Sequence, residues 1–461
     1  MKSLFRWRNL ASLLVLAAAV LAAQPVQAQV TTARLEGLVK DASGAVVPGV
    51  TVTATQAGTN VATDALSNDL GLYVFAKLPP GDYTITAQLP GFKRVEHKNI
   101  KLEVGDTASL PITLQVGDVG ETVSVTEELS GVDTVSTSLG NVINTRQIEE
   151  LPLVNRNPMD LFYLQPGANR FITGGRIDGL RGTTSNVTVE GIAATEPDLG
   201  SGATSVATAV PVEAVSQYRV VTSSASAEYG RGAGAQVQVV YRSGTNDFHG
   251  SLFEFHRNKA LNANSFSNNR AGLPRPAFIR NQFGGSIGGP IVKDKAFFYF
   301  TYEGIRQKTE SSNNYMVYTP TLKSGIFRYY TKAANSISLV DRNTGALLVS
   351  PADIAQIDLL NVDSTRIGKD PSGLFDKLVG QYSPNNYDIG DGLNTAGLRL
   401  NSINPAPENQ IVFKGDYIIN SNHRLAVSYG YRKTTSFGTL MPMDSAGRTT
   451  GGKNSRRLSF L

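Results

Sequence analysis

Cysteine is absent from all 461 residues, and histidine occurs only four times. A chain without cysteine forms no disulfides and no thiolate metal sites, so apolar burial and sheet pairing must stabilise it. The histidines, His97, His249, His256 and His423, form no His-x-x-x-His pair and no His-Glu-x-x-His motif. We therefore expect neither a metal site nor a bound cofactor.

Beyond its first residues the sequence also lacks an apolar run of the roughly 18 residues that a membrane-spanning helix needs. Basic residues precede the shorter apolar run Leu10–Ala23, and Val26-Gln27-Ala28 follows it. This arrangement is typical of a secretory signal, and we expect residues 1–28 to be cleaved on export. If the exported chain enters a membrane, it does so as strands.

Excess charge is small. Three of the 43 basic residues and none of the 38 acidic residues lie in the signal, which leaves 40 basic against 38 acidic residues and a net charge of +2. Such a balance gives no argument for binding to nucleic acid, and we expect no nucleic-acid partner.

Two long alternating segments, joined at Lys293-Asp294, are the most informative part of the sequence. One face of the first segment carries Phe283, Gly285, Ile287, Gly289 and Ile291, and the other carries Gln282, Gly284, Ser286 and Gly288. In the second segment Phe298, Phe300 and Tyr302 alternate with Tyr299, Thr301 and Glu303. Strands of about ten residues with aromatic ends are typical of a transmembrane β-barrel, but an ordinary antiparallel sandwich shows the same alternation.

Residues 29–116 alternate short β-prone segments with turn sequences such as Asp41-Ala42-Ser43-Gly44 and Pro79-Pro80-Gly81-Asp82. This spacing predicts a small β-sandwich. Pairs of apolar side chains two residues apart would fill its core, namely Val50 and Val52, Tyr73 and Phe75, and Tyr83 and Ile85.

Residues 117–127 join the sandwich to the next region and contain the β-prone segment Glu121-Thr122-Val123-Ser124-Val125-Thr126. Such a segment pairs readily with the edge of a partner's sheet through main-chain hydrogen bonds. The alternative is a linker or the last strand of the sandwich.

Residues 128–245 predict a small α+β unit. Asn144 and Gln147 form a capping box for one short helix, and Asn157 with Pro158 begins a second. Strands are expected at Ser185–Glu190 and Gln217–Val221. A unit of this size buries little on its own and needs an enclosing wall.

Several motifs occur in the order of one known family. They are Pro48-Gly49-Val50, Gly71-Leu72-Tyr73, Leu78–Tyr83 and Gly91-Phe92, then Asn155-Arg156-Asn157, Gly179-Leu180-Arg181-Gly182 and Asn186–Ile192, then Ala227–Gly234 and Ser243–Gly250. The first set resembles the carboxypeptidase regulatory-like domain, a transthyretin- or starch-binding-like sandwich. The whole series resembles the TonB-dependent outer-membrane receptors, specifically the Oar-like branch, in which that sandwich precedes a plug and a barrel.

The resemblance implies roles for particular residues. The plug motif would comprise Arg181, Gly182, Asn186, Glu190 and Gly191, where Glu190-Gly191 replaces the family's usual Asp-Gly. The plug–barrel junction would comprise Glu228, Tyr229, Gly230, Gly232, Gly234 and Gly244, whose glycines would let the plug and barrel backbones approach closely. Glu121–Thr126 lies where a TonB box would. The regulatory-like fold also allows Tyr73, Phe75, Tyr83 or Phe92 to stack on sugars, although core packing already explains their spacing.

No catalytic motif has a suitable context. Gly284-Gly285-Ser286-Ile287-Gly288 fits Gly-x-Ser-x-Gly, but a nucleophile elbow needs a strand, a sharp turn and a helix, whereas both flanks here alternate as strands. The glycines at 230, 232 and 234 lack the helix of a phosphate-binding loop. We expect that the chain is not an enzyme.

From residue 246 onward the pattern predicts six strands: 250–257, 282–292, 296–306, 410–419, 424–433 and 455–461. Residues from about 308 to 407 are expected to form a long extracellular loop, with a short helix that begins at Ser350-Pro351 and carries Ile354, Ile357 and Leu360. Six strands cannot enclose a plug, since even the smallest barrels need about eight. We therefore expect residues 246–461 to be the start of an incomplete barrel in an N-terminal portion of a longer receptor.

The resemblance thus implies a mainly β protein exported to the outer membrane of a Gram-negative cell. Its partners would be outer-membrane lipid, TonB with its inner-membrane energising complex, and an extracellular ligand. The implied function is energised uptake of a scarce siderophore, glycan or peptide. The alternative is an adhesion protein that binds carbohydrate or protein and uses the barrel only as an anchor.

Overall fold

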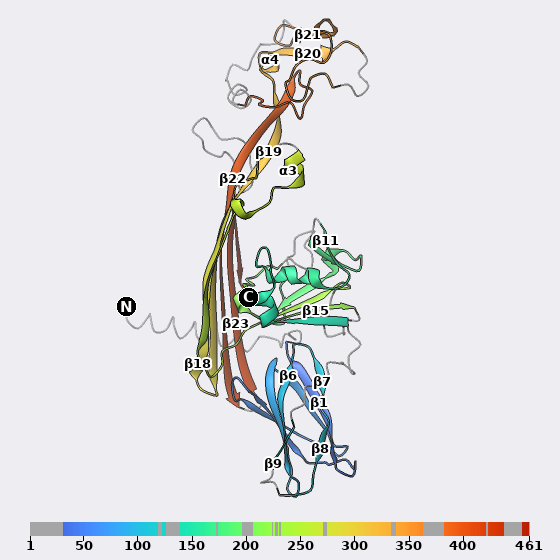
Figure 1. The fold of residues 1–461 in the computed structure, drawn as a ribbon, viewed down its shortest axis with the longest axis vertical. Coiled ribbons are helices and arrows are strands. Elements are labelled where there is room, and N and C mark those ends of the chain that lie inside the picture. Colours follow the sequence, from blue (N-terminus) through green and yellow to red (C-terminus); the bar gives the residue numbers. More distant parts are fainter. Residues whose placement is uncertain are drawn as a thin grey trace, which may run out of the picture.

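The computed structural model describes residues 31–118, 122–125, 139–171, 174–195, 206–223, 225, 229, 232–270, 274–332, 338–362, 382–420, 423–437 and 454–460. Three bodies are visible in Figure 1: a tall curved sheet, a small α+β body beside its middle, and a sandwich beyond the end of the sheet that carries the β18–β19 turn. Strands dominate all three, which confirms the predicted mainly β fold.

The sandwich packs a sheet of order β4-β1-β7, with β8 also on β1, against a sheet of order β3-β2-β5-β6-β9. The strands are β1 (Ala33–Asp41), β2 (Thr51–Gln56), β3 (Ala62–Leu66), β4 (Leu72–Leu78), β5 (Gly81–Gln88), β6 (Arg94–Leu102), β7 (Thr107–Ser109), β8 (Ile112–Leu114) and β9 (Thr122–Val125).

Aromatic side chains fill the centre of the sandwich. Tyr73, Phe75 and Tyr83 are at most 4% exposed, and Tyr73 donates a hydrogen bond to the Leu110 carbonyl at 2.7 Å. Phe92 packs half-buried against the same core. The three buried rings therefore present no free face for a sugar, whereas Phe92 keeps part of its surface exposed.

The α+β body, called the plug below, contains a sheet of order β10-β15-β16-β13-β14 and a separate hairpin, β11–β12. Its elements are β10 (Leu139–Asn144), α2 (Thr145–Glu150), η1 (Pro158–Leu164), β11 (Ala168–Phe171), β12 (Gly174–Ile177), η2 (Gly182–Thr184), β13 (Asn186–Val189), β14 (Ile192–Ala193), η3 (Val212–Ala214), β15 (Val215–Ser223) and β16 (Gln236–Tyr241).

Both predicted helix caps of the plug are present. The Asn144 side chain accepts from the Gln147 amide, and the Gln147 side chain accepts from the Asn144 amide. Asn157 caps η1, which begins at Pro158 and is a 3-10 helix. The two strands predicted for this region correspond to β13 and β15.

The tall sheet is antiparallel, with order β17-β18-β19-β22-β23-β24. Its strands are β17 (His249–Asn258), β18 (Phe278–Val292), β19 (Ala296–Tyr318), β22 (Thr395–Asn420), β23 (His423–Phe437) and β24 (Asn454–Phe460). All six predicted strands are therefore found. Within the described residues β17 and β24 form two open edges, as expected of an incomplete barrel.

The two faces of this sheet differ in polarity. Gln282, Thr301 and Glu303 are at most 2% exposed on the face toward the plug. The opposite face exposes apolar side chains on every strand from β17 to β23, namely Leu252, Ile287, Phe300, Phe413, Leu425, Val427 and Tyr429. Apolar residues outside and polar residues inside are typical of a barrel wall in lipid and are the reverse of a sandwich in water.

The loop expected between residues 308 and 407 begins later and ends earlier than predicted. β19 and β22 stay paired from Ala296 and Tyr417 to Tyr318 and Thr395, so the hairpin projects well past the neighbouring strands (Figure 1). At its tip lie α4 (Pro320–Lys323) and the hairpin of β20 (Ile326–Tyr330) with β21 (Ile354–Asp358). Short helices α3 (Phe266–Arg270) and η5 (Lys259–Leu261) follow β17.

The helix expected after Ser350 is also wrong. Only a single 3-10 turn forms, η6 (Pro351–Asp353), and the chain then continues as β21. Pairing of Ile354 with Tyr330 and of Ile357 with Phe327 outweighs the helical spacing of these side chains. In the described part of the chain no helix is long and apolar enough to cross a membrane.

Candidate functional site

The contact between plug and barrel wall centres on the turn that joins β13 to β14. Glu190 and Gly191 have φ values of 52° and 76°, as in the tight hairpin turns that favour Asp-Gly. The Glu190 carboxylate lies 2.9 Å from Lys414 Nζ on β22 and accepts from Ser428 Oγ on β23 at 3.2 Å. It also accepts from the Tyr241 amide at 2.6 Å. Glutamate, which is longer than the aspartate usual in such a turn, therefore links the plug to two barrel strands.

A second plug–barrel contact is built on Arg156. Its guanidinium lies 3.8 Å from the centre of the Phe255 ring on β17 and 3.6 Å from a Glu213 carboxylate oxygen. Glu213 in turn accepts from Ser251 Oγ on β17 at 2.8 Å. Arg156 also has a positive φ of 47°, so the backbone is turned to present this side chain to the wall.

The sandwich contacts the plug through the loop Glu103–Asp106, which follows β6. The Val104 amide donates to Gln217 Oε1 at 2.7 Å. Arg219 Nη1 donates to the Val104 carbonyl at 2.5 Å and to Asp106 Oδ1 at 2.9 Å. Burial raises the pKa of Asp106, and the opposing effect of Arg219 does not cancel this rise.

The sandwich also contacts the end of the barrel sheet, called the rim here and defined by Thr245, Asn246 and Asp294. The Asn246 amide donates to the Gly58 carbonyl at 2.9 Å, and Asn60 Nδ2 donates to Asp294 Oδ1 at 3.2 Å. Asn246 Nδ2 binds the same Asp294 oxygen at 2.7 Å. The sandwich is therefore tied to both plug and barrel.

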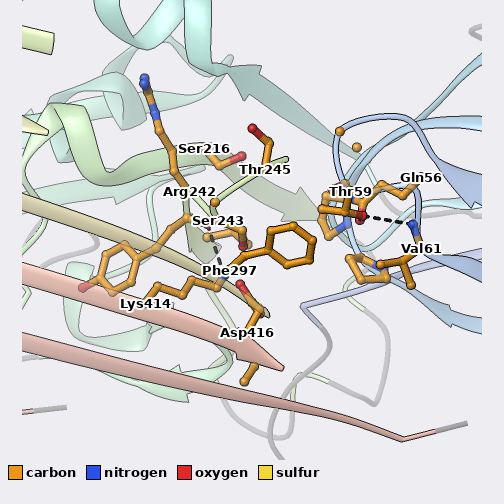
Figure 2. A pocket seen from close by; sticks show the side chains of 18 of the residues that line it. Gln56, Thr59, Val61, Ser216, Arg242, Ser243, Thr245, Phe297, Lys414 and Asp416 are labelled. Atoms are coloured by element: carbon orange, nitrogen blue, oxygen red, sulfur yellow. Dashed lines mark hydrogen bonds between the residues drawn. The ribbon is translucent and has the colours of Figure 1, made fainter. Parts of the chain in front are cut away.

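A cavity of about 610 Å³ lies where the three bodies meet. Figure 2 shows Gln56, Thr59 and Val61 of the sandwich on one side and Arg242, Ser243 and Lys414 of the plug end and barrel on the other. Asp416 and Phe297 of the barrel wall also line it. The junction is thus bridged by hydrogen bonds around a hollow.

The candidate TonB box is partly described. Thr122–Val125 forms β9, which pairs in parallel with β6 from Arg94 to His97. Glu121 and Thr126 lie outside the described residues. The segment therefore occupies the edge of the sandwich as its last strand, one of the alternatives that its sequence allowed.

The junction glycines have different neighbours. An added Cβ at Gly244 would lie 2.3 Å from the Phe298 carbonyl oxygen and 2.6 Å from that of Gly289, so the chain touches the barrel backbone there. At Gly232 and Gly234 the added atom would meet Thr184 and Ser185 of the plug itself. The expected approach of Gly232 and Gly234 to the barrel is therefore wrong. Tyr229 is described, whereas Glu228 and Gly230 lie outside the described residues.

The remaining plug-motif residues serve the plug itself. Arg181 is exposed and precedes η2, and Gly182 is buried within it. Asn186 begins β13 and accepts from Thr195 Oγ1 at 3.3 Å. Among the motif residues that the structure describes, Glu190 is the one whose side chain forms hydrogen bonds with the barrel wall.

Sequence reasoning missed the residues that meet these groups, namely Lys414, Glu213, Gln217, Arg219, Asn246 and Asp294. Their partners lie up to 234 positions away in the chain, and no local pattern signals such pairs. Within the described residues no group of three or more His, Cys, Asp or Glu side chains is placed to bind a metal.

Comparison with known families gives two matches. Residues 240–459 match the outer membrane beta barrel domain, and residues 34–115 match the carboxypeptidase regulatory-like domain. The TonB-dependent transporter Oar of Myxococcus xanthus is 29% identical over 266 residues, which cover 54% of this chain and 24% of that protein. The chain thus spans about a quarter of the length of this relative.

Solved structures give weaker likenesses. The siderophore receptor PirA from Acinetobacter baumannii is 15% identical, with a TM-score of 0.34 over 71% of this chain and 44% of that one. Catechol 1,2-dioxygenase from Acinetobacter radioresistens is 12% identical, with a TM-score of 0.16 over 21% of this chain and 56% of that one.

Proposed function

We propose, on the premise that this chain is an outer-membrane relative of the TonB-dependent receptors, that the protein takes up an extracellular ligand by energised displacement of its plug. The ligand class is a scarce siderophore, glycan or peptide. The proposal assigns no bond-making or bond-breaking step to the chain.

One observation carries this proposal. The plug is a compact body with its own sheet, held against the wall by the buried pair of Glu190 with Lys414 and by Arg156 with Phe255. A wall whose polar face packs on a separate α+β body suits a pathway that opens when that body moves.

TonB is the proposed partner, and Glu121–Thr126 is the proposed contact. The described part of this segment already pairs as a strand with β6, so its main chain is competent for pairing with a partner strand. Strand pairing depends on main-chain groups and requires little of the side chains.

The test is binding of the purified periplasmic domain of TonB to the full-length receptor in detergent. Val123→Pro removes a main-chain donor and should weaken binding at least tenfold. Ser124→Ala is the matched control, because Ser124 is exposed and its amide is retained, and binding should stay within twofold. Equal binding by both variants would exclude this segment as the TonB contact.

Adhesion is the second candidate function, and the projecting β19–β22 hairpin with its folded tip favours it. Deletion of Glu121–Thr126 separates the two in cells that carry the full-length receptor. Energised uptake should be lost on deletion, whereas surface binding through the tip should persist.

A further inference from the structure

The sandwich has no assigned role, yet it contacts the two bodies that must separate when the plug moves. It binds plug strand β15 at Gln217 and Arg219 and binds the rim at Asn246 and Asp294. A body that holds both sides of a junction resists their separation. In Figure 1 it also lies directly beyond the plug, at the end of the wall that carries the short β18–β19 turn.

The chemistry of these contacts makes them separable. The apolar core of the sandwich contains only sandwich residues, whereas the apolar core of the plug includes Val412 of barrel strand β22. In the described part of the chain, hydrogen bonds and one ion pair join the sandwich to the plug and the rim. Separating the sandwich from the plug therefore opens neither apolar core, although it uncovers Val104, and such polar interfaces are usual for domains that move relative to one another.

Strand β6 connects the two relevant ends of the sandwich. β9 pairs with the first residues of β6, Arg94–His97, and the plug-binding loop Glu103–Asp106 follows its last residue, Leu102. A load applied to β9 is therefore delivered through the β6–β9 ladder to the sandwich. From the sandwich it reaches the hydrogen bonds with β15 and with the rim.

We propose that the sandwich is a removable clamp that ties plug strand β15 to the barrel rim, and that load on β9 releases it before the plug leaves the wall. The release step rests on the function proposed above. The clamp itself does not, because it concerns contacts within this chain.

The chain offers a covalent way to close the clamp. An added Cβ at Gly58 would lie 3.7 Å from Cβ of Thr245, within the range of about 3.5–4.5 Å found in disulfides. Because the native sequence has no cysteine, Gly58→Cys with Thr245→Cys gives a single defined bridge. Thr53→Cys with Asp64→Cys is the matched control, since these residues pair within the sandwich and leave the rim free.

Amide hydrogen exchange of the full-length receptor in lipid nanodiscs is the measurement. Arg219→Gln opens the clamp on the plug side and should speed exchange along β10 and β15 at least tenfold. Asn60→Gly removes the side-chain hydrogen bond to Asp294 and so opens the clamp on the rim side. Glycine readily adopts the positive φ of 54° found at this position, so the backbone is not strained. Exchange at residues 57–60 should become faster. The oxidised rim bridge should slow exchange at residues 57–60, and reduction should restore the native rate.

Two outcomes would overturn the clamp: unchanged exchange in β10 and β15 of Arg219→Gln, or failure of the rim bridge to form in the folded receptor. Addition of the periplasmic domain of TonB tests release separately. It should speed exchange at residues 103–106 in the native receptor and in the control bridge, but not with the rim bridge closed. If the domain binds and exchange stays the same, release is wrong; if it does not bind at all, the proposed function fails while the clamp stands on its own data.

Discussion

The plug–barrel interface and the sandwich–plug interface are built from different interactions. At the first, Val412 joins the plug core, and the Glu190–Lys414 pair is buried, with side-chain exposures of 12% and 7%. At the second, Val104 and Asp106 contact Gln217 and Arg219 through hydrogen bonds and an ion pair, and the apolar core of the sandwich includes no plug residue. A buried ion pair is costly to leave half-made, whereas polar contacts without a shared apolar core regain hydrogen-bond partners from water once they separate. The difference indicates a plug joined to the wall through a shared apolar core and a sandwich joined to the plug mainly through polar groups.

The largest effect is expected from breaking the firm interface at Glu190. Glu190→Ala leaves the Lys414 ammonium buried without its carboxylate and should lower the free energy of plug opening by about 3–5 kcal/mol. Native-state amide exchange at β13 and β16 measures this loss. Adding Lys414→Met removes the stranded charge, so the double variant should recover most of the stability. If Glu190→Ala is as stable as the native protein, the plug–barrel interface is no firmer than the sandwich–plug interface, and the comparison fails.

A smaller effect is expected at the close approach of Gly244. A Cβ there would lie under 3 Å from backbone atoms of Phe298 and Gly289, so Gly244→Ala must shift backbone and should cost about 1–3 kcal/mol. Gly415→Ala in β22 is the control, because its added Cβ would meet only the Phe413 ring at 3.4 Å. Amide exchange across residues 241–246 reads the difference, and equal rates in the two variants would contradict the geometry.

The smallest effect concerns pH at the weaker interface. Burial raises the pKa of Asp106 in the docked state, so that state binds a proton more tightly than the undocked state. The stabilisation of docking by the protonated Asp106 carboxyl is present at low pH and is lost as pH rises through the raised pKa. Docking of residues 103–106 should therefore tighten between pH 7 and pH 4, and Asp106→Asn should flatten the profile. Amide exchange corrected for its intrinsic pH dependence measures this, and weaker docking in acid would reverse the sign.

Local patterns were sufficient to predict much of the fold. Alternation located the β18–β19 hairpin and its turn, and the Asn144 capping box located α2. The same patterns failed where pairing outweighed them, since Ile354 and Ile357 have helical spacing but lie in β21. Periodicity also could not show how far β19 and β22 extend, because their outer halves are rich in polar residues.

The candidate site was less predictable. A resemblance singled out Glu190, but nothing near it in sequence indicates Lys414 or Ser428 as its partners. The same holds for Arg219, which meets Asp106 across 113 positions. Glycine in a motif indicates close approach but not to what, which is why Gly244 and Gly234 have different neighbours. Tertiary pairs of this kind follow from the assembled fold rather than from any short segment.

The length of the β19–β22 hairpin has a spatial consequence. β22 has 26 residues and so extends about 85 Å at about 3.3 Å per residue, whereas a strand needs only about 9–11 residues to cross a bilayer. More than half of the strand therefore stands outside the lipid. The hairpin tip is therefore tens of ångströms from the plug, at about 3.3 Å per strand residue, so a contact made at the tip and a contact made at the plug lie far apart along one strand pair.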